Sequence, residues 1–345
     1  MGMMRKVAMG VGGLGALVVV GGGGFYAWAV SAAQAKIDVI YDVHRADFPI
    51  PFPLTETELG ALRAERLASA PPPTDPKAPP PDPLAGVDLD ALATERAAAR
   101  GKHLVESLYP CGECHGADFG GGVMVDDDMI GHILGPNLTP GKGSRTLTYT
   151  AADWDRMVRH GVKPDNKGSP MPSKDFFATS DRELSDIVTY IRSLPNVDKE
   201  VPTWTFGPLG NVLMATGKIE ISAAVHPTKH RIDHVIEPPA ATPDATYGKH
   251  IAQTCTGCHR ANFAGGPIAG GPPDWPPAAN ITPTGLAGWT YEDFLRALRE
   301  GKGKTGAPLR EPMASMPKFA KNMTDTELQA MWAYIQTLPP APTGS

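Results

Sequence analysis

The length, composition and charge of this chain allow two domains of ordinary size and argue against a nucleic-acid partner. The chain has 345 residues, of which 41% are hydrophobic and 20% charged, and its formal net charge is −5. A nucleic-acid-binding protein needs a dense basic surface, which a mildly acidic chain without lysine or arginine runs does not offer. The 36 prolines and 38 glycines favour extended stretches and tight turns.

The amino terminus predicts export of everything that follows it. Arg5 and Lys6 precede an uncharged run over 7–30 that is long enough to cross a bilayer as one helix. We therefore expect a membrane anchor within 1–36, with the rest of the chain in the periplasm or on the outer face of the cytoplasmic membrane. The alternative is a cleavable signal peptide, because the Ala-Gln-Ala tripeptide at 33–35 fits the cleavage pattern, although signal h-regions usually span only about 7 to 15 residues.

Two proline-rich stretches are expected to connect more compact parts. We expect 37–87 to be an extended spacer, in which 70–83 (APPPTDPKAPPPDP) forms stiff polyproline II. A short helix is possible within it around 55–67, starting with a capping pattern. The second stretch, 198–241, has an irregular composition and is expected to be an interdomain linker. It carries His226, His230 and His234.

An internal repeat organises the region outside the spacers. The segment 101–104 (GKHL) recurs as 248–251 (GKHI), and 137–140 (NLTP) recurs as 280–283 (NITP). Self-similarity of this kind indicates two copies of one structural unit. We therefore expect two homologous domains, at 88–197 and 242–341.

The helical signals repeat as well. Each unit has a threonine that starts a capped helix, followed by a glycine that ends it, and a later capping box that begins an amphipathic final helix. The fold class predicted is therefore all-α, with two tandem domains after an amino-terminal transmembrane helix. The helix starts are Thr150, Ser180, Thr290 and Thr324, the glycines are Gly161 and Gly301, and the buried stripes are Leu184, Ile187, Val188, Ile191 and Leu328, Met331, Trp332, Ile335.

All four cysteines fall in two Cys-x-x-Cys-His motifs, the attachment signal for c-type haem. Two cysteines three residues apart can reach both vinyl groups of one porphyrin, and the adjacent histidine can bind the iron. In a zinc site the two Cys-x-x-Cys pairs lie about 15 to 20 residues apart, whereas the two pairs of this chain lie 141 residues apart (255 − 114). A thioredoxin-like motif would need a βαβ setting, which the sequence around these motifs does not have. A structural disulfide would leave the histidines unexplained. We expect two covalent haems c, at Cys111, Cys114 and His115, and at Cys255, Cys258 and His259.

The second axial ligand of each iron must come from further along each unit. Met171 lies in a Gly/Pro-rich loop just before the final helix, and the Met-Pro pair recurs at Met316, with Met313 as an alternative in the same loop. A methionine opposite histidine raises the reduction potential and suits an electron carrier. A bis-histidine iron that uses the histidines of 198–241 is the competing hypothesis.

These motifs resemble the class I cytochromes c, in a membrane-anchored tandem-domain dihaem form similar to the cytochrome subunits of periplasmic dehydrogenases. The resemblance covers about 88–196 and 242–340. It implies a few helices around each haem, one exposed porphyrin edge, and a carbonyl at Pro136 that accepts the N–H of His115. The second unit has Ala279 in the place of that proline. The dehydrogenase subunits commonly carry three haem motifs, whereas this chain has two.

The function expected is electron transfer without substrate chemistry, since two filled axial positions leave no substrate site, and no catalytic residue is assigned. The expected partners are redox proteins: a dehydrogenase, a quinol-oxidising complex or a terminal oxidase. The chain could instead be the cytochrome subunit of a dehydrogenase complex. A dihaem peroxidase would need an iron with an open sixth position, and a haem-based sensor would need an output domain.

Overall fold

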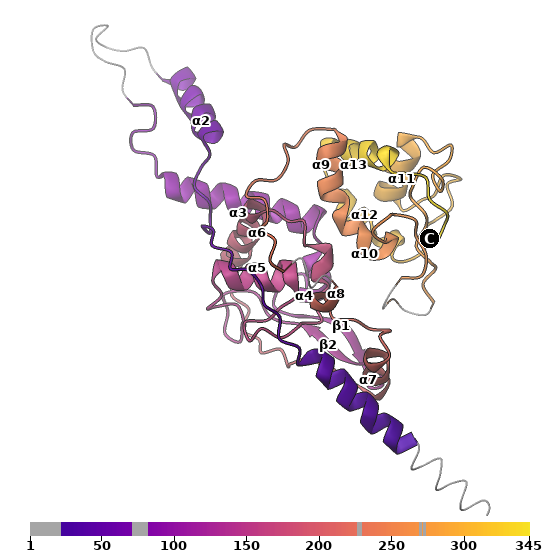
Figure 1. Cartoon of the computed structure of the whole chain (residues 1–345). Helices are drawn as coiled ribbons and strands as arrows, with labels where there is room; N and C mark the ends of the chain where they lie inside the picture. The colour runs from indigo at the N-terminus through magenta and orange to yellow at the C-terminus, as the bar shows by residue number, and fades with distance from the viewer. Residues whose placement is uncertain (1–21, 71–81, 226–229, 269–270, 272–273) are drawn as a thin grey trace, which may run out of the picture.

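The computed structural model describes residues 22–70, 82–225, 230–268, 271 and 274–345. Within these ranges the regular structure is mostly helical and forms two successive units, as Figure 1 shows. A helix covers 22–37, and no helix among the described residues is long and apolar enough to cross a membrane. Most of the predicted anchor run, and nearly all of the predicted polyproline segment at 70–83, lie outside the described residues.

Corresponding elements build the two units. In the first unit they are α3 (Leu89–Ser107), α4 (Cys111–His115), α5 (Ala151–His160), η1 (Ser173–Asp175) and α6 (Asp181–Ser193). In the second they are α9 (Ala245–Ile251), η3 (Ala252–Cys255), α10 (Thr256–His259), α11 (Tyr291–Glu300), η4 (Met313–Ser315), α12 (Pro317–Ala320) and α13 (Asp325–Thr337). The predicted capping boxes begin α5, α6, α11 and α13, and left-handed glycines end α5 and α11.

The first and last helices of each unit cross at a glycine. A Cβ on Gly101 in α3 would lie 2.0 Å from the carbonyl oxygen of Asp186 in α6. A Cβ on Gly248 in α9 would lie 1.9 Å from the carbonyl oxygen of Ala330 in α13. No side chain fits at either crossing, which gives the repeated GKH segments a structural reason. The predicted stripes of the final helices are buried beside the crossings, with Leu184 and Leu328 both at 0% exposure, except that Trp332 is only partly buried.

The predicted helical class needs one correction, because the first unit also contains a small antiparallel sheet. Strands β1 (Gly122–Asp127) and β2 (Gly131–Gly135) form a hairpin, and β3 (Thr205–Phe206) pairs with β2. Strand β3 comes from 198–241, so the sheet joins residues that are distant in sequence. In the second unit, an isolated bridge between Gly266 and Ala278 occupies the corresponding stretch.

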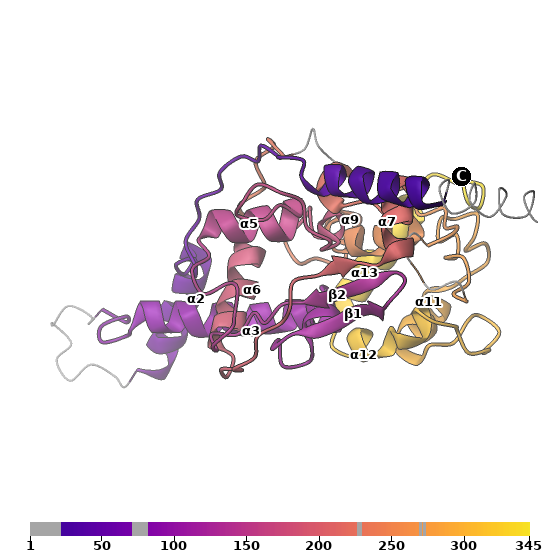
Figure 2. The same cartoon turned by 90° about the horizontal axis from the view of Figure 1, so that it is seen from below.

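The segment 198–241 is more ordered than predicted. Besides β3 it contains α7 (Pro208–Ala215) and α8 (Ser222–Val225). Met214 and Ala223 from these helices are buried in a second, smaller hydrophobic cluster together with Ala33 of helix 22–37. The Nζ atom of Lys36 donates to the carbonyl of Met214 at 2.7 Å, and Figure 2 shows helix 22–37 beside α7.

The beginning of the predicted spacer also lies on the first unit rather than apart from it. The backbone N–H of Tyr41 donates to the carbonyl of Asn166 at 2.9 Å, and the Ser185 hydroxyl donates to the carbonyl of Pro49 at 2.8 Å. Lys167 and Asp38 form an ion pair at 2.6 Å. Further along, α2 (Glu56–Ser69) begins with the predicted capping box.

The two units meet through equivalent residues. His103 in α3 lies 2.7 Å from Glu327 in α13, and His250 in α9 lies 2.9 Å from Glu183 in α6. Both glutamates also close the capping boxes of their helices. Such reciprocal pairing is the pattern of an isologous contact, in which the same surface is used twice. One large hydrophobic cluster accordingly includes residues from both units.

We expect Gly101→Ala to lower the free energy of unfolding by about 2 kcal/mol, because a methyl group must push α6 away. Gly60→Ala is the matched control, since it also lies in a helix but its added Cβ meets nothing within 4 Å. That change should stabilise the protein by about 0.5–1 kcal/mol. Urea unfolding of the full chain measures both values. Equal stability of the two variants would contradict the close crossing.

The reciprocal contact should give stability a pH dependence. The hydrogen bond with Glu327 raises the pKa of His103 above 6.5 against the opposing effect of burial. The stabilisation is therefore complete below 6.5 and is lost as the pH rises through the raised pKa. Glu327 sets the lower pH limit of this stabilisation, which is lost as the pH falls through the pKa of Glu327. Burial alone would raise that pKa, but the hydrogen bonds from His103 and Thr324 outweigh burial and hold it below 4.5.

We expect His103→Gln to remove this alkaline loss, an effect of about 0.5–1 kcal/mol because the histidine is partly exposed. Urea unfolding midpoints from pH 5 to pH 9 (roughly the histidine range) measure it. Lys102→Gln, at the exposed neighbour of His103 in α3, is the control and should keep the alkaline loss. An unchanged profile in His103→Gln would contradict this assignment.

Candidate functional site

The predicted site residues of the first unit line one cavity of about 380 Å³. This volume falls within the range of about 300–1,000 Å³ that is usual for cofactor and ligand sites. Cys111, Cys114, His115 and Met171 all contribute to its wall, and most of the remaining lining is apolar or aromatic. The structure thus brings together residues that the sequence separates by up to sixty positions (171 − 111).

The short helices α4 and α10 orient the two motif histidines. Nδ1 of His115 lies 3.0 Å from the carbonyl oxygen of Pro136, and Nδ1 of His259 lies 2.8 Å from that of Ala279. A carbonyl can only accept, so each Nδ1 carries the hydrogen and each Nε2 keeps a lone pair. Alanine therefore replaces proline in the second unit without loss of the hydrogen bond. Burial lowers the pKa of both rings, although the carbonyls oppose it, which favours the neutral form.

The cysteines lie in surroundings that disfavour thiolate chemistry. All four are unpaired. Burial raises the pKa of Cys111 to about 12 and that of Cys255 to about 11. Redox-active Cys-x-x-Cys motifs have the opposite property, a lowered thiol pKa. The buried surroundings of these cysteines therefore do not favour a redox-active dithiol.

Hydrogen bonds hold the loop of Met171 against α5. The N–H of Met171 donates to the Ser169 hydroxyl at 3.2 Å, and its carbonyl accepts from the N–H of Ser173 at 2.8 Å. The Ser173 hydroxyl in turn donates to the carbonyl of Met157 at 2.8 Å. The thioether of Met171 is thereby kept at the cavity that contains His115.

In the second unit, the two candidate methionines lie close in the chain and in similar surroundings. Met313 begins η4 and Met316 immediately precedes α12. Both are partly buried and pack against the large cluster, as Cys255 does. Their surroundings therefore do not distinguish Met313 from Met316 as the axial ligand.

Two asparagines brace the carbonyl-bearing segments, a role that the sequence analysis did not assign. Asn137 is fully buried and its Nδ2 donates to the carbonyl of Val197 at 2.6 Å, while its Oδ1 accepts from the N–H of Thr139 at 2.9 Å. Asn280 repeats this pattern with Ala341 and Thr282. The repeated Asn-x-Thr-Pro segment was the available signal, but the partner carbonyls lie some sixty residues away in the chain (197 − 137).

The two motif helices also contact the opposite unit. Glu113 in α4 pairs with Lys318, in α12, at 2.6 Å. Asp175 in η1 lies so close to Gly257, in α10, that a Cβ there would be 2.5 Å from its Oδ2. Burial raises the pKa of Asp175 to about 6. Both Cys-x-x-Cys-His helices thus lie at the interface between the units.

We expect Asn137→Ala to lower the free energy of unfolding by about 1–3 kcal/mol, because it leaves buried backbone groups without partners. Asn322→Ala is the control: its amide donates to the carbonyl of Glu106 at an exposed position, where a change should stay within about 0.5 kcal/mol. Thermal or urea unfolding compares the two. A similar loss in both variants would contradict the bracing role.

Comparison with known proteins agrees with this arrangement. The family described as "Cytochrome c" matches residues 98–195 and 245–339. An alcohol dehydrogenase (quinone) cytochrome c subunit of Gluconacetobacter polyoxogenes is 24% identical over 290 residues, 74% of this chain and 58% of that protein. A fructose dehydrogenase cytochrome subunit of Gluconobacter japonicus is 23% identical over 291 residues, 74% and 57% respectively.

A protein named diheme cytochrome c-type, from Cereibacter sphaeroides, is 22% identical over 255 residues, 66% of this chain and 82% of that protein. The chain spans only 57–58% of the dehydrogenase subunits that it matches. The family match, in contrast, covers more than half of this chain and includes both helical units. This chain belongs to the cytochrome c family and carries two domains of that family.

Proposed function

We propose that this protein is a dihaem c-type cytochrome that carries electrons between redox proteins. Each motif would hold one covalent haem c, through Cys111 and Cys114 in the first domain and Cys255 and Cys258 in the second. The observation that carries the proposal is the orientation of His115: its Nδ1 bonds to a backbone carbonyl, in a cavity that its own two cysteines and Met171 also line.

The residues present fit a haem. The lining of the cavity is largely apolar, which suits the hydrocarbon faces of a porphyrin. The backbone carbonyls of Pro136 and Ala279 fix the histidine tautomer that leaves Nε2 available, as is usual for metal-binding histidines. When bound, the haem iron supplies a one-electron redox couple whose potential the axial ligands set.

For the remaining axial positions we propose Met171 in the first domain and Met316 in the second, with Met313 as the alternative. Two filled axial positions would leave no coordination site for a substrate, so we assign no catalytic residue and favour a carrier. Of the histidines in 198–241, His230 and His234 are poorly placed as rival ligands, because they contact His160 rather than the motif residues, and His226 lies outside the described residues.

The contacts between the domains support electron exchange within the chain. Both motif helices touch the opposite unit, through Glu113 and Lys318 and through Asp175 and Gly257. We propose domain limits of 88–197 and 242–341, with the two haems on the facing sides. An electron taken up at one haem would then leave from the other.

The partner is proposed from the relatives. Those with the longest matches are named as cytochrome subunits of dehydrogenases. We infer that this chain accepts electrons from a dehydrogenase outside the cytoplasmic membrane or from a quinol-oxidising complex, and passes them to an acceptor such as a terminal oxidase. Attachment to that membrane through the amino-terminal run at 7–30 is part of the same proposal.

The test uses the full chain, made in cells with haem-ligation machinery. We expect its mass to exceed that of the polypeptide by two haems. Met171→Ala should remove about half of the iron–thioether absorption band, because one of two irons loses its ligand. Met316→Ala should remove the other half of the band. If Met313 is the ligand instead, Met313→Ala should remove that half and Met316→Ala should leave it unchanged. Met129→Ala, at an exposed methionine, is the control.

Two results would contradict the proposal. A mass equal to that of the bare polypeptide would exclude covalent haem. Rapid turnover of peroxide by the reduced wild-type protein would indicate a dihaem peroxidase with an open iron position instead of a carrier.

A further inference from the structure

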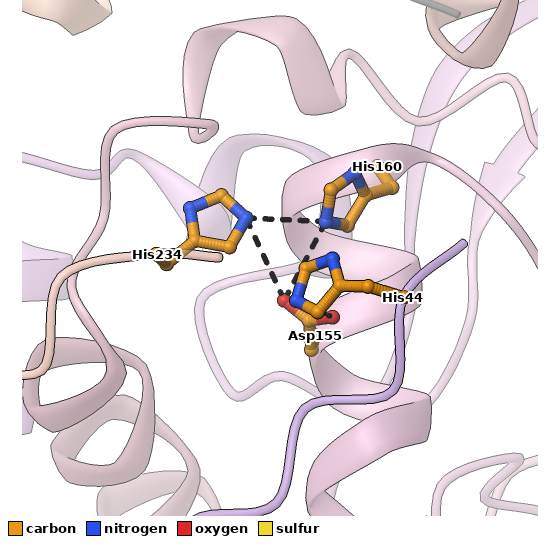
Figure 3. Close-up of side chains that lie close together, drawn as sticks. All are labelled: His44, Asp155, His160 and His234. Carbon is orange, nitrogen blue, oxygen red and sulfur yellow. Dashed lines mark hydrogen bonds and ion pairs between the residues drawn. The ribbon is translucent and has the colours of Figure 1, made fainter. Parts of the chain in front are cut away.

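Four side chains from three separate segments converge beside α5, outside the proposed haem cavity. Figure 3 shows His44 from the amino-terminal segment, Asp155 and His160 from α5, and His234 from the segment 198–241, pointing at one another. The atoms that could bind a metal all lie within 4.8 Å of one another. None of the four lines the cavity of Cys111 and Met171. The cluster therefore needs its own explanation.

The hydrogen bonds around His160 fix which of its nitrogens carries the hydrogen. Nε2 of His230 donates to the carbonyl of Ala223 at 2.8 Å, which is the tautomer whose Nδ1 accepts. Nδ1 of His160 lies 3.1 Å from that acceptor and must donate to it. Nε2 of His160 is consequently unprotonated, and its lone pair faces the centre of the cluster.

The other two rings are arranged in the same way. Nδ1 of His44 donates to the carbonyl of His230 at 3.1 Å, which is the arrangement that makes Nε2 the metal-binding nitrogen, 3.7 Å from Oδ2 of Asp155. The ring of His234 has a hydrogen bond with the backbone of Phe177 that favours protonation of the ring, so the ring is its donor. Its Nε2 points to Nε2 of His160 at 3.1 Å.

The centre of the cluster is therefore rich in lone pairs and poor in hydrogens. Burial and the neighbouring imidazoles lower the pKa of His160 to about 2, and burial and Arg159 lower that of His234 to about 3. Both rings are neutral at ordinary pH, which is the form that binds metals. Two unprotonated nitrogens at 3.1 Å repel each other unless a cation lies between them.

The carboxylate of Asp155 adds a negative charge at the same point. Its Oδ1 lies 3.7 Å from Nε2 of His160 and 3.8 Å from Nε2 of His234, and its Oδ2 has no hydrogen-bond partner. Arg159 pairs with this carboxylate at 2.6 Å, but it also pairs with Asp181 at 2.8 Å. One arginine between two carboxylates leaves one negative charge unbalanced within this group.

We propose that His44, Asp155, His160 and His234 bind one divalent transition-metal ion of the zinc class. Three imidazoles and a carboxylate are ordinary zinc ligands. A tetrahedron with bonds of about 2.0–2.1 Å has edges of about 3.3–3.4 Å. The separation between His160 and His234 is 3.1 Å, those from the three rings to the nearer oxygen of Asp155 are 3.7 to 3.8 Å, and all the ligand atoms lie within 4.8 Å, so a bound ion would draw the side chains together slightly. The second ring nitrogens are already bonded to the protein, as in established metal sites.

The site has the character of a structural metal centre. Four protein ligands complete the tetrahedral sphere and leave no position for a substrate. The ligands join the amino-terminal segment, α5 of the first domain and the segment that leads to the second domain. Zinc would thereby cross-link three parts of the chain, and this role does not depend on the proposed haem function.

The test strips metals from the full chain with a chelator, adds Zn²⁺ back, removes the unbound ion by dialysis and measures the zinc that remains. Zinc is determined by atomic emission and protein by amino-acid analysis, so the ratio does not depend on haem content. We expect one tightly bound zinc per wild-type chain and a rise in unfolding temperature on addition of Zn²⁺. His44→Gln, which removes the most peripheral ligand, should weaken zinc binding by at least about tenfold, at or beyond the effect of losing an outer-shell partner.

His160→Ala combined with His234→Ala should abolish binding. His132→Gln is the matched control, because His132 is a half-exposed histidine beside its own carboxylate partner, Asp126, at 2.6 Å. It should bind zinc like the wild type. Circular dichroism of the metal-free variants shows whether they remain folded, and His44→Gln keeps the test valid if the buried double variant does not fold.

Two outcomes would overturn the proposal. The first is a wild-type protein that takes up no stoichiometric zinc and gains no stability from Zn²⁺. The second is an equal zinc affinity in the wild type and in folded His44→Gln. Either result would mean that the four side chains are only packed together.

Discussion

The close crossing of the first and last helices in each unit is the constraint on which the rest of the structure depends. At Gly101 and Gly248 a backbone carbonyl of the partner helix takes the space that a side chain would need. The crossing fixes α3 against α6 and α9 against α13. Since α4 follows α3 after only three residues, and η3 and α10 follow α9 directly, the positions of both motif helices are fixed as well. The motif histidines then reach carbonyls that Asn137 and Asn280 hold in place.

The contact between the units uses the same helices a second time. His103 and His250 lie two residues beyond the crossing glycines, and their partners are the glutamates that cap α6 and α13. One glutamate therefore both starts a helix and binds the neighbouring unit. This double contact joins two small units that share one large hydrophobic cluster. It also keeps both motif helices at the interface.

Much of this could be predicted from the sequence, because the signals are local. The capping boxes at Ser180 and Thr324, the helix-ending glycines and the buried stripes all depend on residues within a few positions of one another, and the structure confirms them. The β1–β2 hairpin is local but was not predicted, and β3 was missed because it pairs with β2 from far along the chain. The cluster of His44, Asp155, His160 and His234 was missed for the same reason, and the irregular composition of 198–241 gave no sign that His230 is buried. Ligand identities at the methionine positions remain predictions.

The path of residues 38–49 along the first unit has a mechanical consequence. This segment is held on the domain by the hydrogen bonds of Tyr41 and Pro49 and by the ion pair of Asp38. Lys36 binds the preceding helix to α7. A freely jointed tether would let the domain tumble and sample every orientation. Here these contacts fix the direction of helix 22–37 relative to the domain. Any structure that binds the helix therefore also sets the orientation of the domain, and with it the side that faces a diffusing partner.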